Sequence, residues 1–242
     1  MITFTVDIGN TRTKVAFFDG VKLLHEQVID DVAQWASLIK NFKPEYAAMC
    51  AVGEGADEVA SIIQQLHVPL LRVTYQTQFP FTINYQTPHT LGMDRVAGVA
   101  AARSLFPDMN CLVIDAGTCV TYDFISAIGV YHGGAIAPGL EMRLKAMHQF
   151  THKLPKPELK FPDDFEGKST ETSLLSGVCY GLVDEIMGRI LRYSTQYGTV
   201  QVLLCGGNSQ MLAKHIKNNI FAAPSLVLLG LNQILVFNVK KM

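Results

Sequence analysis

Two short stretches of this sequence carry residue types that suit the binding of phosphate groups and metal ions. The first reads D-I-G-N-T at residues 7–11, and Thr13 and Lys14 follow it. An aspartate supplies hard oxygen ligands for a cation, and a glycine lets backbone N–H groups approach a phosphate. The stretch predicts a phosphate-binding turn with Asp7 as a metal ligand. A plain hairpin with a polar tip stays open, because Asp, Gly and Asn are also ordinary turn residues.

The second stretch repeats this design. It reads D-A-G-T at residues 115–118, and 108 residues separate Asp7 from Asp115 in a chain of 242. Strand-like runs flank each aspartate, at residues 4–6 and 14–18 around Asp7 and at residues 112–114 and 120–124 around Asp115, so each stretch predicts a hairpin of two strands. Two such hairpins half a chain apart indicate a duplicated unit, with the acid-tipped hairpins facing one another across a cleft.

Paired hairpins of this kind suit phosphoryl transfer from a nucleotide triphosphate. The nucleotide and its magnesium need hard oxygen ligands and donors directed at several phosphate oxygens, and little covalent chemistry is left to the protein. The chain contains no G-x-x-x-x-G-K-[ST] loop and no G-x-G-x-x-G after a strand. P-loop and dinucleotide-binding folds are therefore disfavoured.

A third stretch, G-M-D-R at residues 92–95, precedes an Ala-rich run. This run has high helix propensity, so the stretch is predicted to begin a helix. Asp94 either stabilises the first helical turn against the helix dipole or accepts a proton in the cleft. Arg95 either forms a structural ion pair or binds an anionic substrate.

Two glycine-rich stretches complete the pattern. Residues 133–139 read G-G-A-I-A-P-G and lead into a predicted helix over 140–149. They form either a plain loop or a connection on the phosphate side or between domains. Farther on, a predicted strand over 202–205 runs into Gly206, Gly207 and Asn208, and then into a helix from 210 to about 217. A ligand could lie against this turn, because glycine lets other atoms approach the backbone.

The bulk composition limits the possible partners. The apolar fraction is 49%, and 20 basic residues stand against 21 acidic ones, so neither the footprint of a nucleic-acid binder nor a disordered chain is indicated. There is no cationic leader, and the apolar run near residues 226–231 is far short of a membrane span. We expect a cytoplasmic protein that binds small molecules and neither nucleic acid nor membrane.

The five cysteines are scattered and form no C-x-x-C pair. This spacing favours neither a disulfide framework nor a zinc site, and we interpret them as buried free thiols that act as small hydrophobic residues. A long helix is predicted over residues 169–197, because apolar residues recur at helical spacing and define a face that must be buried. Most of this face is expected to pack in the core, and a share of it could form a contact between two copies of the chain. The apolar residues of this face are Leu174, Leu175, Val178, Leu182, Ile186, Ile190 and Leu191.

In their order and spacing, the four stretches at residues 7–11, 92–95, 115–118 and 133–139 resemble type III pantothenate kinases, and the similarity runs through essentially the whole chain. The resemblance implies an α/β protein with a duplicated ribonuclease-H-like, actin-like ATPase fold. Its halves would be residues 1–108 and 109–242, and it would act as a homodimer. The implied reaction is the ATP-dependent phosphorylation of pantothenate to 4'-phosphopantothenate, the first step of coenzyme A biosynthesis. Magnesium and a monovalent cation, potassium or ammonium, would be the cofactors.

The resemblance also implies roles for individual residues. Asp94 would be the catalytic base, Asp7 a magnesium ligand and Asp115 the ligand of the monovalent cation. The nucleotide contacts would be Asp7, Gly9, Asn10, Thr11, Thr13, Lys14, Gly117 and Thr118. The substrate contacts would be Tyr85, Gly92, Met93, Asp94, Arg95 and Thr170, with Thr170 acting across the subunit interface.

Two positions depart from the family pattern. Such kinases often carry Gly-Gly-Asp where this chain has Gly206, Gly207 and Asn208, and a small residue is frequent where it has Cys119. The missing carboxylate at Asn208 leans toward a nucleotide-binding regulatory relative without kinase activity. The intact Asp7, Asp94 and Asp115 lean toward an enzyme. A kinase of the same superfamily for another small substrate is the other alternative.

Overall fold

The computed structural model describes residues 1–29 and 33–239, which fold as two compact α/β units. Unit 1 holds the described residues of Met1–Met109, Ile125–Gly133 and Ser225–Met242. Unit 2 holds Asn110–Phe124 and Gly134–Pro224. The C-terminal helix thus packs in unit 1. The predicted halves, residues 1–108 and 109–242, concern a duplication of sequence and stay a prediction, as does the cleft between the hairpins.

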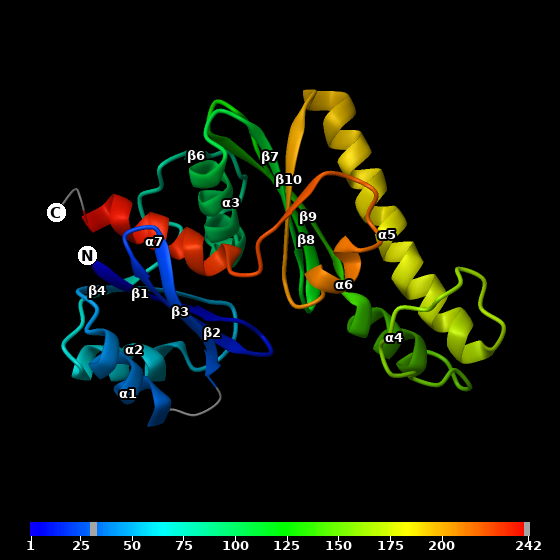
Figure 1. Cartoon of the computed structure of the whole chain (residues 1–242), viewed down its shortest axis with the longest axis horizontal. Helices are drawn as coiled ribbons and strands as arrows, with labels where there is room; N and C mark the ends of the chain where they lie inside the picture. The colour runs from blue at the N-terminus through cyan, green and yellow to red at the C-terminus, as the bar shows by residue number, and fades with distance from the viewer. Residues whose placement is uncertain (30–32, 240–242) are drawn as a thin grey trace. The chain divides into compact units, whose positions relative to one another are not determined.

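The sheet of unit 1, whose first three strands are blue in Figure 1, has the strand order β3-β2-β1-β4-β5. The strands are β1 (Ile2–Ile8), β2 (Thr13–Asp19), β3 (Lys22–Ile29), β4 (Tyr46–Ala51) and β5 (Leu70–Arg72). Strands β1, β2 and β3 pair antiparallel, whereas β4 runs parallel to β1 and β5 runs parallel to β4. The first predicted hairpin is therefore confirmed as β1 and β2.

Helices cover both faces of this sheet, and the alternation along β1 decides which side chains meet them. Helices α1 (Ala33–Phe42) and α2 (Ala56–Gln65) cover the face that receives Phe4, Val6 and Ile8. Helices α3 (Met93–Leu105) and α7 (Leu226–Val239) lie on the other face, where α7 contacts β1. There Thr3 donates to the side-chain oxygen of Asn232 at 2.6 Å. Asp7 follows Thr3 and Thr5 on this polar row, facing the side of α3.

The segment that leads into α3 pairs with the start of β9 (Val130–Pro138). Strand β6 (Thr82–Ile83) pairs parallel with the first residues of β9. The short 3-10 helix η1 (Pro88–Thr90) follows, and Gly92 is the N-cap of α3. The prediction that residues 92–95 begin a helix is confirmed.

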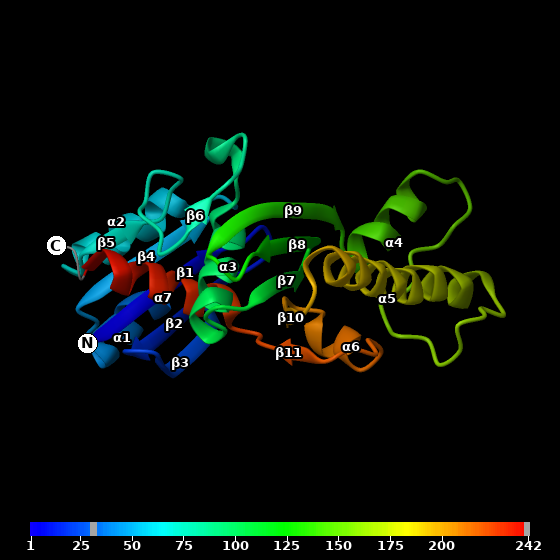
Figure 2. The same cartoon turned by 90° about the horizontal axis from the view of Figure 1, so that it is seen from above.

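The sheet of unit 2 has the order β11-β10-β7-β8-β9. Its other strands are β7 (Asn110–Ala116), β8 (Cys119–Ile125), β10 (Val200–Cys205) and β11 (Ile220–Ala222). Its helices are α4 (Leu140–Gln149), α5 (Thr170–Tyr197) and α6 (Ser209–Ala213). The C-terminal half of α5 lies against β7 and β10, and its N-terminal half continues beside α4 (Figure 2). The second hairpin and the helix over 140–149 are confirmed.

Three local details differ from the expected ones. Leu191 on α5 is 68% exposed, because it lies about 100° around the helix from the buried Ile190, so it does not pack in the core, and the dimer contact stays a prediction. The helix after the Gly-Gly turn ends at Ala213 rather than near residue 217. Residues 133–138 belong to strand β9, so the alternative of a plain loop is wrong, whereas the chain does pass from unit 1 to unit 2 between Gly133 and Gly134. Gly134 allows this pairing, because a Cβ atom there would overlap the carbonyl group of Tyr122 on β8.

Within the described residues, no helix combines the length and apolar character needed to cross a membrane.

Candidate active site

The first hairpin presents polar groups at its tip. Residues 9–12 connect the two strands, and the Gly9 N–H donates to the Arg12 carbonyl at 3.1 Å. Asn10 and Thr11 are exposed at this tip, and Thr13 is half-buried. Thr13 begins β2, so four of the predicted nucleotide contacts, Gly9, Asn10, Thr11 and Thr13, lie on or beside one turn.

Lys14 lies directly opposite Asp7 in the ladder between β1 and β2, and both side chains are half-buried. Directly opposed residues in an antiparallel pair project from the same face of the sheet. A cation and a carboxylate thus share one face next to the hairpin tip.

Asp7 has a second neighbour on the other side of β1. Cys50 is its partner in the parallel ladder with β4, and the Cys50 thiol donates to Oδ1 of Asp7 at 3.6 Å. Burial raises the pKa of Cys50 well above its ordinary value, and the charges of Asp7 and Asp94 raise it further. Both aspartates therefore act on the same thiol. The structure brings Asp7 and Asp94 together in unit 1 although 86 residues lie between them in the sequence.

Asp94 lies in the first turn of α3, where its Oδ1 accepts the Arg95 backbone N–H at 2.9 Å. The Asp94 carboxylate thus lies at a helix N-terminus, where negative charge is favourable, and its charge also acts on the thiol that contacts Asp7. Arg95 and Met93 are each 8% exposed. A Cβ atom on Gly92 would collide with the Asp94 carboxylate, so Gly92 gives this side chain its room.

The loop after β4 closes on the first hairpin. The N–H groups of Val52 and Gly53 both donate to the Ile8 carbonyl, at 3.0 and 3.2 Å. A Cβ atom on Gly53 would lie 2.5 Å from the carbonyl oxygen of Gly9. Sequence reasoning missed Gly53 and Cys50. The available signal was the stretch C-A-V-G at the end of a buried strand.

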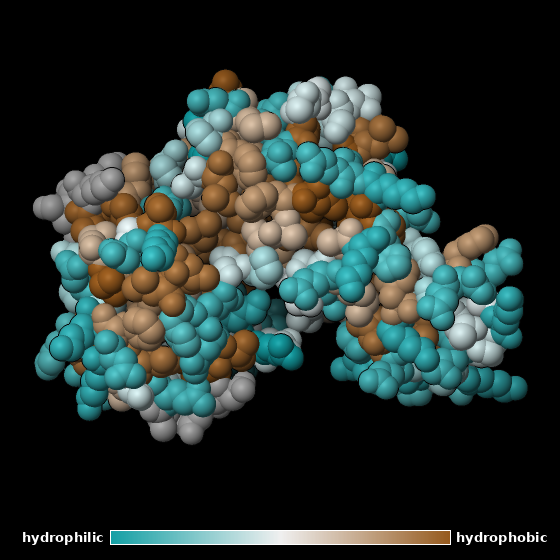
Figure 3. All heavy atoms as spheres, viewed as in Figure 1, coloured by the Kyte–Doolittle hydropathy of each residue, from teal (hydrophilic) through white to brown (hydrophobic). Residues whose placement is uncertain are grey.

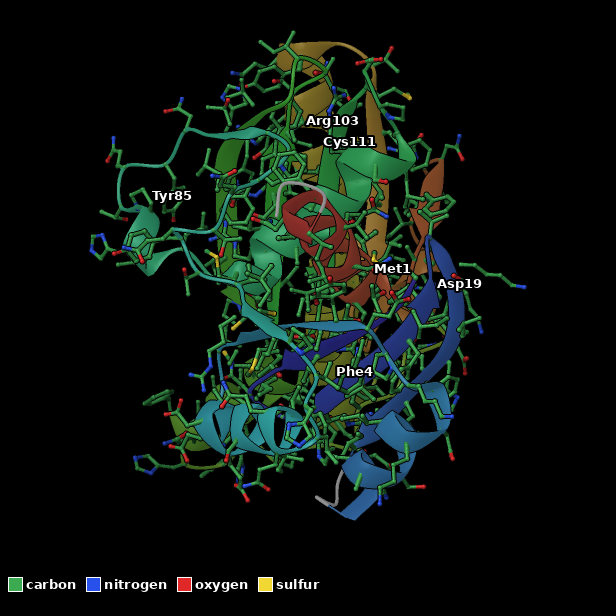
Figure 4. The ribbon with its side chains drawn as sticks, turned by 90° about the vertical axis from the view of Figure 1, so that its left-hand side faces the viewer. Met1, Phe4, Asp19, Tyr85, Arg103 and Cys111 are labelled. Atoms are coloured by element: carbon green, nitrogen blue, oxygen red, sulfur yellow. The ribbon has the colours of Figure 1, made fainter. Side chains whose placement is uncertain are left out.

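Tyr85 lies elsewhere in unit 1, on the segment between β6 and η1 (Figure 4). Its ring stacks on Tyr131 of β9 with 6.4 Å between centroids. Gly133 has a φ of 81°, and a Cβ atom there would lie 3.1 Å from the Tyr85 ring. Strand β9 therefore sets the position of this predicted substrate contact.

The second hairpin has a shorter tip, in which the Gly117 N–H donates to the Cys119 carbonyl at 3.0 Å. Asp115 is half-buried and Thr118 is exposed. The thiol of Cys205, the partner of Asp115 in the parallel ladder with β10, donates to Oδ2 of Asp115 at 3.5 Å. Cys119 is a free thiol but only half-buried, so the prediction of a buried thiol is wrong for it, whereas the four cysteines Cys50, Cys111, Cys179 and Cys205 are buried free thiols, as predicted. Two of them, however, contact carboxylates, so they are not simply small hydrophobic residues.

The Gly-Gly turn after β10 packs on this hairpin. Gly206 has a φ of 89°, and a Cβ atom there would lie 2.5 Å from Oδ1 of Asp115. The Asn208 N–H donates to the Ala116 carbonyl at 3.0 Å. The hairpin backbone thus packs against Gly206, whereas a Cβ atom on Gly207 would meet nothing within 4 Å, and a ligand lying against this turn stays a prediction.

A further element meets the same hairpin. Gly139, the N-cap of α4, donates its N–H to the Thr118 carbonyl at 3.1 Å.

Thr170 lies on a different element. It is the exposed first residue of α5, and Ser169 is the N-cap of this helix. The region around α4 and the start of α5 presents a mostly hydrophilic surface in Figure 3.

A magnesium ion suits the donor set around Asp7. No group of three or more His, Cys, Asp or Glu side chains in the described part of the chain could hold a metal ion. Magnesium usually keeps several waters and is bound by one or two carboxylates together with substrate phosphates. A single carboxylate beside a turn rich in donors fits this mode, because the nucleotide brings the remaining oxygen ligands.

Comparison with solved structures defines the class of protein. A Baf family protein from Campylobacter jejuni has a TM-score of 0.63 at 22% identity, covering 98% of this chain and 99% of that one. The activator of the 2-hydroxyisocaproyl-CoA dehydratase from Clostridium difficile, solved with bound ADPNP, has a TM-score of 0.53 at 11% identity, covering 100% of this chain and 96% of that one. The fold is the actin-like ATPase fold, as predicted.

Sequence comparison defines the family. The model of the family described as type III pantothenate kinase matches residues 3–192. The type III pantothenate kinase of Bacteroides fragilis is 43% identical over 238 residues, which cover 96% of this chain and 97% of the relative. The chain belongs to the type III pantothenate kinase family.

Proposed function

We propose that this protein transfers the γ-phosphoryl group of ATP to the primary hydroxyl of pantothenate, giving 4'-phosphopantothenate and ADP in the first step of coenzyme A biosynthesis. Family membership supports the reaction, its two substrates and a divalent metal. The observation that carries the proposal in the structure is the pair Asp7 and Asp94, whose charges both act on Cys50. One carboxylate is available for a cation and another for a proton.

The reaction forms a bond between the pantothenate hydroxyl oxygen and the γ-phosphorus while the bond to the bridging oxygen of ADP breaks. Asp94 accepts the hydroxyl proton. An ordinary aspartate, with a pKa of about 3.9, is too weak a base to ionise an alcohol in advance. Proton uptake is therefore late in the reaction, and Asp94 first orients the hydroxyl by accepting its hydrogen bond.

Each hairpin would contribute contacts to the nucleotide. The proposed contacts are Gly9, Asn10, Thr11, Thr13, Lys14, Gly117 and Thr118. Asp7 would hold magnesium, which neutralises phosphate charge when bound. The residues of this chain then contribute mostly by positioning and by charge, as is usual for phosphoryl transfer.

The proposed substrate contacts are Tyr85, Gly92, Met93, Asp94, Arg95 and Thr170. Arg95 would face the carboxylate of pantothenate, and its low exposure supports this role because a desolvated guanidinium binds a carboxylate strongly.

The monovalent cation, the homodimer and the cytoplasmic location are also part of the proposal. Asp115 would bind potassium or ammonium. Thr170 would reach the substrate of a second copy of the chain.

The proposal is tested by measuring 4'-phosphopantothenate formation from ATP and pantothenate by the purified protein, with magnesium, and with potassium or ammonium present or absent. We expect product that depends on magnesium and increases with the monovalent cation. Folded protein that forms no product in any of these buffers would contradict the proposed reaction. Product formation that is equal in sodium and potassium would contradict only the cation assignment.

A further inference from the structure

The same kind of side-chain contact, from a thiol to a carboxylate, occurs once within each unit. In unit 1, a thiol on the strand beside β1 donates to the carboxylate near the end of β1, from Cys50 to Asp7 at 3.6 Å. In unit 2, a thiol on the strand beside β7 donates to the carboxylate near the end of β7, from Cys205 to Asp115 at 3.5 Å. In both cases the two residues are direct partners in a parallel ladder.

The repetition follows from the alternation of side chains along the strands. In unit 1, Met49 belongs to the core beneath α1 and α2, so its neighbour Cys50 projects to the other face, where Asp7 lies. In unit 2, Leu204 belongs to the core beneath α5, so Cys205 projects to the other face together with Asp115. Each thiol is buried, with at most 2% of the residue exposed. Each carboxylate is half-buried at the end of its ladder.

We propose that Cys50 and Cys205 are positioning residues, and that each thiol orients the neighbouring carboxylate toward the cation that it binds. This inference rests on the proposed function, which assigns magnesium to Asp7 and a monovalent cation to Asp115. The thiol contact occupies one named oxygen of each carboxylate, and this restrains rotation of the carboxylate about its last torsion. Although an S–H donor is weak, the same geometry occurs twice at corresponding places.

Another buried cysteine provides the contrast within the same molecule. Cys179 on α5 is also fully buried, but its thiol donates to the backbone carbonyl of Lys160 at 3.7 Å. It belongs to the core of unit 2 and contacts neither predicted metal ligand. Cys179→Ala should therefore show how much the loss of a buried thiol costs in packing alone, because no metal-binding carboxylate loses a contact.

The test compares alanine and serine at both positions. Cys50→Ala and Cys205→Ala remove the donor, whereas Cys50→Ser and Cys205→Ser retain one in a side chain of similar shape. Cys179→Ala is the control for packing. The first readout is binding, measured as the rise in Tm. For the Cys50 variants, ADP is present and magnesium is titrated. For the Cys205 variants, ADP and magnesium are present and potassium is titrated. The second is the cation concentration that gives half-maximal turnover.

We expect Cys50→Ala to need about tenfold more magnesium for the half-maximal rise in Tm, at the lower end of the range for groups that orient metal ligands. Cys50→Ser should recover to within about threefold of the wild type. Cys205→Ala and Cys205→Ser should behave likewise toward potassium. Cys179→Ala should lower the starting Tm without changing either requirement.

The proposal is overturned for either cysteine if its alanine variant has the cation requirement of the wild type, or if serine is no better than alanine. A wild-type protein whose Tm does not respond to potassium overturns the Cys205 half. Because the change in Tm reports binding and not turnover, it tests the role of the thiols independently of the proposed reaction. A wild type that binds magnesium and ADP but forms no product contradicts the reaction, while the comparison of Cys50 variants still decides the role of the thiol.

Discussion

The two hairpins carry the same aspartate in different surroundings. The tip of the first spans residues 9–12, and Asn10 and Thr11 are exposed there. The thiol of Cys50 donates to its Asp7, and the charges of Asp7 and Asp94 both raise the pKa of this thiol. The tip of the second spans only residues 117–118. Close backbone contacts hold it, through the turn at Gly206 on one side and the N-terminus of α4 on the other.

This difference suggests a division of roles. In unit 1, charged and donor groups gather around Asp7, so changes of charge should dominate its response to mutation. In unit 2, the neighbouring segments pack so closely on the Asp115 hairpin that glycine is needed at the contacts. An added methyl group should therefore affect this hairpin more than a change of charge does. The predictions that follow test this contrast in order of decreasing effect.

The largest effect is expected for Asp94→Asn. Because the amide cannot accept the hydroxyl proton, kcat should fall by about 100- to 10,000-fold, with much smaller changes in the KM values. Steady-state kinetics with both substrates will measure this. Asp57→Asn, at an acid on α2 whose side chain is 94% exposed, is the control and should retain wild-type kcat. If Asp94→Asn and Asp57→Asn have equal turnover, Asp94 is not the base.

In unit 2, Gly206→Ala should be strongly destabilising while Gly207→Ala is nearly neutral. The backbone of Gly206, with a φ of 89°, is strained for alanine, and the added Cβ would lie 2.5 Å from the Asp115 carboxylate. A Cβ atom on Gly207 would meet nothing within 4 Å. Backbone strain alone costs about 1–3 kcal/mol. Urea unfolding of both variants measures the difference, and similar midpoints would show that the turn does not pack on the hairpin as described.

A smaller and more specific effect is expected where β9 positions Tyr85. Gly133→Ala would push against the Tyr85 ring, so we expect the KM for pantothenate to rise by several-fold and that for ATP to change little. Gly129→Ala is a matched control, because Gly129 has a similar φ of 77° and its nearest neighbour is the side chain of Arg103 at 3.7 Å. Equal KM values for pantothenate in both variants would indicate that Tyr85 does not contact this substrate.

The smallest effect concerns the buried thiols at alkaline pH. Burial raises the pKa of Cys179 from 9.0 to about 11. The unfolded chain releases this proton near pH 9, whereas the folded chain holds it until about pH 11. The contribution to stability is therefore complete below pH 9 and is lost as the pH rises toward 11. In Cys179→Ala, the decrease in Tm between these pH values should be shallower than in the wild type. An unchanged slope would mean that this thiol titrates normally in the folded chain.

The sequence predicts those parts of the site that local patterns determine. Alternating apolar residues and turn chemistry identify both hairpins, and helix propensity after residue 95 identifies the start of α3. These features depend on residues that are close together in the chain, so short-range rules are sufficient.

The contacts made between strands could not be predicted in the same way. Cys50 and Cys205 lie 43 and 90 residues from the aspartates that they contact, and only the strand order brings them together. The exposure of Leu191 and the strand conformation of residues 133–138 likewise depend on which neighbours are present. The glycines there allowed a plain loop as one alternative, whereas Gly134 provides the space for β8.

The division of roles between the hairpins is tested most directly by comparing Asp94→Asn and Asp115→Asn in one potassium titration of turnover. The account predicts that Asp94→Asn stays slow at every potassium concentration. Asp115→Asn should need more potassium than the wild type and recover part of its turnover when potassium is high. If both variants are equally slow throughout, or if Asp115→Asn has the wild-type potassium curve, the two aspartates do not have the separate roles proposed.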